Sequence, residues 1–293
     1  MTEQAPAQCI TVPPGTRPGP GLRTPGFLDL PARTVKPRTS GLLHVLDDGM
    51  SVPEARQHLA VAGPLIDIWK FGWGTAYIDQ NLEEKLELLE RHGVRACTGG
   101  TLLEIAWAQG AVTQFLDWAM AVGFPCVEVS CGTVELTRAE KSGLISVAAQ
   151  RFGVLAEIGR KDAGASVLAG QWAADAEADL EAGADYVVTE GRESGTVGLY
   201  EPDGSVRADV VAAVVAAIGA ERVLFEAPQR AQQTWLIRRY GANVNLGNVR
   251  PAAALSVETL RLGLRADTVN TASVNTDTVN TGPDGPSRPG GAA

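Results

Sequence analysis

The chain has 293 residues, of which 45% are hydrophobic and 20% are charged, and its formal net charge is −9 at pH 7. This length and composition are typical of a globular protein with a large core. The acidic balance argues against a protein that binds nucleic acid or an anionic membrane surface, although a local cluster of lysines and arginines can still bind a small anion.

Both ends of the chain differ in composition from the middle. Residues 1–22 are rich in proline and glycine, and residues 267–293 repeat a Val-Asn-Thr unit before ending in glycine and proline. Such segments have little apolar surface to bury. We therefore expect a disordered N-terminal tail over 1–22, one folded domain over 23–266, and a disordered C-terminal tail over 267–293.

Eight short apolar runs follow one another between these tails. They are rich in valine, isoleucine and aromatic residues, which is typical of buried parallel strands. In chain order they are LLHVL (42–46), LIDIWKF (65–71), VRAC (94–97), CVEVS (126–130), GVLAEIG (153–159), DYVVTEG (185–191), RVLFEA (222–227) and NVNLG (243–247).

Longer segments between the runs have the pattern of amphipathic helices. The segment 79–93 carries leucines on one face, with Asp79 as the expected N-cap and Gly93 as the stop. Segments 229–241 and 256–264 are similar. Eight strand–helix units in about 250 residues predict an α/β fold of the (β/α)8 TIM-barrel type. The alternative is an open doubly wound sheet, but no GxGxxG follows the first run.

Neither a secretory signal nor a membrane span is expected. No apolar run reaches the ~18 residues that a span needs, and the N-terminus lacks a basic region followed by an apolar one. The cysteines Cys9, Cys97, Cys126 and Cys131 show no CxxC spacing, so neither a zinc site nor a disulfide framework is expected. These features predict a cytoplasmic protein with reduced thiols.

Polar residues lie at the end of nearly every predicted strand, where a barrel gathers side chains at one mouth. Since burying unpaired charge is costly, this ring is either a plug of ion pairs or a ligand site. Carboxylates without His or Cys suit Mg²⁺, and glycines beside polar residues let backbone N–H groups approach an anion. The loops after strands 7 and 8 of barrels often bind phosphate. The residues predict a metal-assisted enzyme acting on a small phosphorylated acid.

Several segments resemble the phosphosulfolactate synthase family. They are KFGWGT (70–75), GGTLLE (99–104), EIGRKD (157–162), VVTEGRESGTVGLYEPDG (187–204), FEAPQRAQQTWLI (225–237), VNLGNV (244–249) and LRLGLRADT (260–268). The similarity runs in order from about Lys36 to Thr268. It implies a (β/α)8 barrel that adds sulfite to C3 of phosphoenolpyruvate with Mg²⁺, giving (2R)-2-O-phospho-3-sulfolactate. It also implies a homo-oligomer, a trimer of barrels.

The resemblance implies a role for individual residues, with Lys161 as the acid that protonates C2. The predicted catalytic residues are Lys161, Glu157 and Arg192. The predicted substrate-binding residues are Lys70, Gly99, Gly100, Arg160, Ser194, Gln229, Asn245, Gly247 and Asn248. The predicted metal ligands are Asp47, Glu128, Glu190 and Glu226.

Three positions depart from the family pattern. Asp48 stands where the family usually has lysine, Thr98 where it has proline, and Cys131 where it has aspartate. These changes leave two alternatives open. One is a related enzyme that uses another nucleophile or phosphorylated acceptor in specialised metabolism. The other is a non-catalytic member, like the plant heat-stress proteins of the family.

Overall fold

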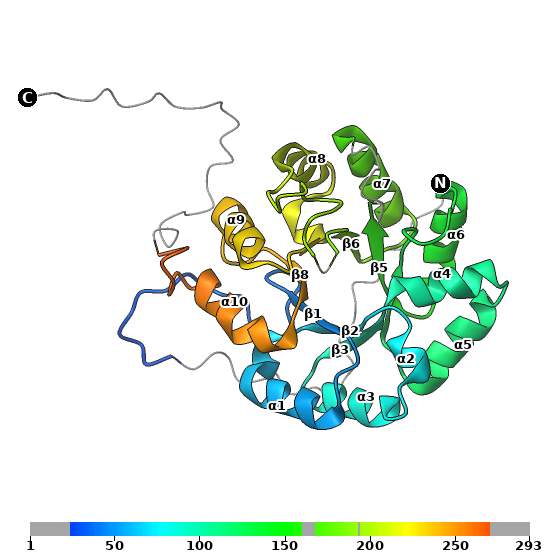
Figure 1. The fold of residues 1–293 in the computed structure, drawn as a ribbon, viewed down its shortest axis with the longest axis horizontal. Coiled ribbons are helices and arrows are strands. Elements are labelled where there is room, and N and C mark those ends of the chain that lie inside the picture. Colours follow the sequence, from blue (N-terminus) through cyan, green and yellow to red (C-terminus); the bar gives the residue numbers. More distant parts are fainter. Residues whose placement is uncertain (1–23, 160–167, 193, 270–293) are drawn as a thin grey trace, which may run out of the picture.

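Eight parallel strands close into a barrel in the computed structural model, which describes residues 24–159, 168–192 and 194–269. Each strand pairs with its neighbours in sequence, and β1 pairs with β8 to close the sheet. The helices lie around the outside (Figure 1). This confirms the predicted (β/α)8 barrel and excludes the open doubly wound sheet.

The strands lie close to the predicted apolar runs. They are β1 (Leu43–Asp47), β2 (Ile68–Phe71), β3 (Arg95–Thr98), β4 (Cys126–Val129), β5 (Gly153–Ile158), β6 (Tyr186–Thr189), β7 (Val223–Glu226) and β8 (Leu246–Val249). Alternate residues face opposite sides of the sheet. One set fills the barrel interior, where Ile68, Cys97 and Leu224 pack together, and the other packs under the helices.

The helices follow the strands in order. They are α1 (Val52–Ala62), α2 (Thr75–Ile78), α3 (Leu82–Arg91), α4 (Gly100–Ala108), α5 (Val112–Val122), α6 (Arg138–Ala148), α7 (Ala169–Glu181), α8 (Ala208–Ile218), α9 (Arg230–Tyr240) and α10 (Ala254–Arg261), with short 3₁₀ turns at Gly63–Leu65, Ala220–Arg222 and Pro251–Ala253. No helix in the described ranges is long and apolar enough to cross a membrane.

The boundaries of helices α9 and α3 can be compared with those that the sequence predicts. Helix α9 fills the predicted segment 229–241, with Gln229 as its N-cap and Gly241 as its C-cap. Helix α3 begins after Asn81, so the prediction of Asp79 as its N-cap is wrong. The Asp79 carboxylate instead lies 2.7 Å from the Nζ of Lys85, which is buried on the inner face of α3.

Strand β8 begins three residues later than the predicted run. The Asn243 side chain accepts a hydrogen bond from the backbone N–H of Thr34, at 3.2 Å. The Asn245 Oδ1 accepts one from the N–H of Leu42, at 3.0 Å. Both asparagines therefore belong to the end of the barrel at which the strands start, and the strand proper begins at Leu246.

The predicted tails fall mainly outside the described residues. Of the segment 267–293, only 267–269 is described. The Thr268 side chain is buried, and its backbone N–H donates to the carbonyl of Arg265 at 2.9 Å. Contacts with the folded domain therefore reach Thr268.

Candidate active site

Four charged side chains share the upper layer of the barrel interior. The inward residues Ile68, Cys126, Leu155 and Leu224 are each followed, two positions later, by Lys70, Glu128, Glu157 and Glu226. Because alternation has a period of two, these four also face inward, one layer nearer the C-terminal mouth. None of them is more than 5% exposed.

Lys70 joins two of these carboxylates across the barrel. Its Nζ lies 3.0 Å from Glu128 Oε2 and 3.1 Å from Glu226 Oε1. The second oxygen of each carboxylate accepts a backbone N–H at 2.9 Å, from Gly100 for Glu128 and from Gly191 for Glu226. Strand β2 can carry the buried Lys70 because strands β4 and β7 supply the negative charges of Glu128 and Glu226.

The ionisable groups in this layer shift one another's pKa values. Burial raises the pKa of Glu226 to about 7; Lys70 opposes this rise, and Glu157 and Glu128 add to it. Burial likewise raises the pKa of Glu128. Burial opposes the charge of Lys70, but Glu128, Glu226 and Glu157 outweigh it and hold the Lys70 pKa well above its ordinary value. The cluster can therefore hold an exchangeable proton near neutral pH.

Glu157 and Glu190 end neighbouring strands on one side of the mouth. The backbone N–H of Glu190 donates to Ile158 at 3.0 Å, and both side chains are nearly fully buried. Glu190 Oε1 accepts the N–H of Arg192 at 2.7 Å. Arg192 has a positive φ of 52°, a conformation that is uncommon for a long side chain and that recurs at functional sites.

Two predicted site residues, Arg160 and Lys161, lie outside the described residues. Lys161 is the predicted proton donor, so its role stays a prediction. The described segment nearest to it ends at Gly159, directly after β5.

The loop from β6 to α8 is braced by the first turn of α9. Gln229 Nε2 donates to the carbonyl of Ser194, which brings these two predicted residues together. Gln232 Nε2 donates to the carbonyls of Gly195, at 2.8 Å, and Gly204, at 3.3 Å. Gln232 was not predicted as a site residue. Its position three residues after the N-cap Gln229 is the signal that could have identified it.

Asn248 lies at the C-terminal end of β8, as predicted. It has a positive φ of 50° and is 7% exposed. Its side-chain Oδ1 has no hydrogen-bond partner within the described structure. A buried, unsatisfied carboxamide at the mouth is consistent with a ligand contact.

Two predicted residues do not face the mouth. Asp47 points outward, because His44 and Leu46 occupy the inward positions of β1, and it accepts Trp69 Nε1 at 2.9 Å and the N–H of Met50 at 2.6 Å. The placement of Asn245 at the mouth is also wrong, since its side chain binds Leu42 and Val223 at the opposite end of the barrel.

Close packing accounts for the predicted glycines. A Cβ on Gly99 would lie 2.7 Å from the backbone nitrogen of Trp73, and one on Gly100 would lie 2.8 Å from Ser130 Cβ. A Cβ on Gly247 would overlap Leu224. We predicted that the backbone of Gly100 approaches a bound anion. In the structure its N–H binds Glu128 instead.

Glu104 on α4 shapes the loop after β4 and was not among the predicted site residues. Its carboxylate accepts the N–H groups of Thr133, at 2.6 Å, and Val134, at 2.8 Å, and also the hydroxyl of Ser130. Its place on the helix that follows GGT was the available signal.

Of the three departures from the family pattern, Thr98 is buried, Cys131 is half-buried and Asp48 is exposed.

The four predicted metal ligands do not form one site. No group of three or more His, Cys, Asp or Glu residues suited to a metal occurs in the described residues. Asp47 points away, and all four oxygens of Glu128 and Glu226 already accept hydrogen bonds. Mg²⁺ commonly takes only one or two carboxylates and fills its shell with water and substrate oxygens. Two further carboxylates, Glu157 and Glu190, lie at the ends of the neighbouring strands β5 and β6.

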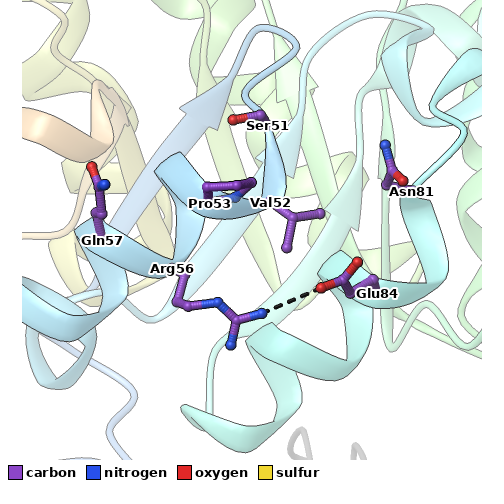
Figure 2. Close-up of a pocket in the computed structure, with 7 residues that line it drawn as sticks. All are labelled: Ser51, Val52, Pro53, Arg56, Gln57, Asn81 and Glu84. Carbon is purple, nitrogen blue, oxygen red and sulfur yellow. Dashed lines mark hydrogen bonds and ion pairs between the residues drawn. The ribbon is translucent and has the colours of Figure 1, made fainter.

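A separate cavity lies on the outside of the barrel, between the first turns of α1 and α3 (Figure 2). Its volume is about 410 Å³. Arg56 and Glu84 form an exposed ion pair of 3.3 Å across it. The lining, which is Ser51, Val52, Pro53, Arg56, Gln57, Asn81 and Glu84, shares no residue with the barrel mouth. This cavity is not the active site.

Comparison with known proteins identifies the family. The model of the (2R)-phospho-3-sulfolactate synthase (ComA) family matches residues 31–267. The chain belongs to this family. The phosphosulfolactate synthase of Bacillus subtilis (strain 168) is 39% identical over 244 residues, 82% of this chain and 97% of that protein. That of Methanothermobacter thermautotrophicus is 38% identical over 82% of this chain and 95% of its own.

More distant matches agree with the barrel. The Arabidopsis thaliana protein HEAT-STRESS-ASSOCIATED 32 is 26% identical over 73% of this chain and 83% of its own length. The crystal structure of a 3-hexulose-6-phosphate synthase has a TM-score of 0.50 and 16% identity, and the match covers 75% of this chain and 99% of that one. At that identity the likeness concerns the fold alone.

The family match also bears on activity. The phosphosulfolactate synthase family is a family of enzymes, so the predicted enzyme class is confirmed.

Proposed function

We propose that this chain is a phosphosulfolactate synthase that joins sulfite to C3 of phosphoenolpyruvate. The observation that carries the proposal is the family match over residues 31–267, together with the meeting of the motif residues Lys70, Glu157 and Glu226 in one layer of the barrel. A scaffold protein has no need of a buried cluster of ionisable groups with raised pKa values at the end of the barrel where such enzymes bind substrate.

The reaction requires one bond-forming step and one proton. The sulfur lone pair of sulfite attacks C3, the C2–C3 π bond breaks, and its electron pair moves toward C2 and the carboxylate. A proton delivered to C2 then completes the addition. We propose Lys161 as the donor, and Glu157 and Arg192 as further catalytic residues.

The third N–H of the Lys70 ammonium is the group that we propose binds the substrate. An ammonium group has three N–H bonds, and two of them point to Glu128 and Glu226. The third has no hydrogen-bond partner among residues 24–159, 168–192 and 194–269, and we propose that it binds the carboxylate or phosphate of phosphoenolpyruvate. Because both carboxylates hold the Nζ in place, Lys70 would act as a fixed point charge and its hydrogen bond would need little reorganisation.

Mg²⁺ is part of the proposal. Glu157 and Glu190 are the residues that would hold it, and when bound it would supply Lewis-acid stabilisation of negative charge on the substrate. Exhaustive treatment with EDTA should abolish activity, and added Mg²⁺ or Mn²⁺ should restore it. Zinc should not substitute, because the mouth offers oxygen ligands. Full activity of the metal-stripped protein would remove Mg²⁺ from the mechanism.

The decisive experiment is a product assay. The protein is incubated with phosphoenolpyruvate, sulfite and Mg²⁺, and the mixture is analysed by mass spectrometry for phosphosulfolactate. We expect the product only when both substrates are present. Phosphoenolpyruvate that remains unchanged in the presence of active, folded protein would contradict the proposal.

A second candidate is an enzyme of the same mouth chemistry with another nucleophile or phosphorylated acceptor. It is favoured by Asp48, Thr98 and Cys131, the positions that depart from the family pattern. Consumption of phosphoenolpyruvate with a different nucleophile, but not with sulfite, would select it. Under either candidate we propose a cytoplasmic homo-oligomer, to be checked by light scattering.

A further inference from the structure

His44 is a buried titratable residue that the proposed chemistry does not use. It is fully buried on the inward face of β1, opposite Ile68 of β2. Its Nδ1 accepts the backbone N–H of Asn248 at 3.2 Å. Its Nε2 has no hydrogen-bond partner in the ranges that the structure describes. An apolar side chain would fill this core position without leaving a polar atom unsatisfied, so the imidazole calls for an explanation.

The ring is neutral and its tautomer is fixed. Burial lowers the pKa of His44 well below its ordinary value, and the positive charges of Lys70 and Arg95 lower it further. A neutral imidazole has one donor and one acceptor nitrogen. Since Nδ1 accepts from Asn248, the proton resides on Nε2. His44 therefore keeps its acceptor toward Asn248 over the whole neutral range.

A partner for its N–H helps to fix the Asn248 backbone. Its φ of 50° is a left-handed conformation that is uncommon for residues with a side chain, although asparagine adopts it more readily than most. The neighbouring Gly247 provides the room, because a Cβ at that position would lie 3.1 Å from His44 Nδ1. The rotation of the Asn248 peptide in turn sets the direction of its carboxamide, whose buried Oδ1 has no partner elsewhere in the described structure.

We propose that His44 is a positioning residue: by accepting the N–H of Asn248 at Nδ1, it holds the left-handed peptide that directs the Asn248 carboxamide into the substrate site. This inference rests on the proposed function, since Asn248 is taken to contact the substrate. It assigns the two ring nitrogens different importance. Nδ1 supports binding through Asn248, and Nε2 does not touch the substrate.

Three substitutions separate the two nitrogens. In His44→Asn, the side-chain oxygen can take the place of Nδ1, and the Nε2 position is lost. In His44→Gln, the amide can reach the Nε2 position, and the acceptor at Nδ1 is lost. His44→Leu removes both. Steady-state KM and kcat, and the Kd for phosphoenolpyruvate, are measured beside the melting temperature of each variant.

We expect His44→Asn to keep the KM of the parent within about two-fold, while His44→Gln and His44→Leu raise it by about 3- to 10-fold, the effect of one lost hydrogen bond. The kcat should change less than KM. If all three variants keep the KM of the parent and only the melting temperature changes, the positioning role is overturned. His44 would then only fill space in the core. A raised KM in His44→Asn with a normal KM in His44→Gln would overturn it in favour of direct donation from Nε2.

A second background tests whether His44 acts through Asn248. Asn248→Gly removes the carboxamide and tolerates the positive φ. In that background His44→Leu should leave KM unchanged, because the group that it positions is absent. A further rise would overturn the proposal. If the parent protein binds no phosphoenolpyruvate, the proposed function fails and this inference fails with it; normal binding by both the parent and His44→Leu defeats the inference alone.

Discussion

The two ends of the barrel handle buried charge in different ways. At the end where the strands start, Arg38 pairs with Asp67 at 2.9 Å and Arg33 pairs with Glu258 at 2.8 Å. The further donors of Arg38 bind the backbone carbonyls of Leu65 and Thr34. Each of these buried carboxylates thus faces at least one arginine, and Arg261, which is also buried at this end, donates to the backbone carbonyls of Val244 and Leu42.

At the mouth, Glu128 and Glu226 both bind the ammonium of Lys70. Burial and the neighbouring carboxylates raise the pKa of Glu226 to about 7. Unsatisfied polar atoms also remain nearby at His44 and Asn248. Ion pairs of the first kind stabilise a fold, whereas a raised carboxyl pKa near neutrality is typical of groups that exchange protons at functional sites. The difference favours the mouth as the end that does chemistry.

The largest effect should come from the predicted proton donor at the mouth. Lys161→Ala should lower kcat by roughly 10²–10⁴-fold, the usual contribution of a general acid. Lys161→Arg should not restore turnover, because a guanidinium does not release its proton in this pH range. Near-parental turnover of Lys161→Ala would move the proton transfer to another group, such as Glu157.

Exchanging one cation at each end should separate function from stability. Lys70→Met leaves Glu128 and Glu226 without their counter-charge, so the free energy of unfolding should fall by roughly 3–5 kcal/mol, and the KM for phosphoenolpyruvate should rise.

The matched variant at the end where the strands start is Arg38→Met. It should cost a similar free energy, since it leaves Asp67 buried without its partner, but the KM and kcat of the folded protein should not change. Denaturant unfolding and steady-state kinetics measure both. A change of KM in Arg38→Met would show that the two ends are coupled.

The mouth should also give stability a pH dependence. Because the folded pKa of Glu226 is raised from 4.5 to about 7, the folded protein holds a proton that the unfolded chain has released between these values. The free energy of unfolding should therefore fall as the pH rises through this window, and the Glu226 contribution should level off above it.

Glu226→Gln should remove that part of the slope, a change of about 2–3 kcal/mol or about 5–10 °C in Tm. Thermal melts between pH 5 and pH 8 measure it. Glu90→Gln, on the exposed face of α3, is the control and should leave the slope as it is.

The smallest effect is expected at the C-terminus. Removing residues 270–293 should shift Tm by less than about 1 °C and leave kcat unchanged, because the Val-Asn-Thr repeat and the Gly/Pro end carry little apolar surface. Truncation after Arg265 is the contrasting variant. It removes the buried Thr268 and the Asp267 carboxylate, which lies 3.6 Å from Arg265, and it should lower Tm clearly.

The sequence predicted the barrel well because alternation, run length and spacing are all local signals. It predicted the inward Glu128, Glu157 and Glu226 for the same reason. It misplaced Asp47 because a single extra residue reverses the face of a strand, and the predicted run ended at residue 46. It misplaced Asn245 because the start of β8 is set by contacts with the distant segment at 33–42, which no local pattern encodes.

Because of the contacts of Glu104, the backbone path of the loop after β4 does not depend on most side chains of that loop. The loop after β4 is held through the Ser130 hydroxyl and backbone N–H groups, so its course is encoded by a carboxylate on α4. Side chains at positions 131, 133 and 134 are then free to diverge while the path of the chain persists. Cys131, where the family pattern has aspartate, is an example of such divergence. For protein engineering, this loop is a place where side chains can be changed without changing the path of the backbone, provided that Glu104 and Ser130 are retained.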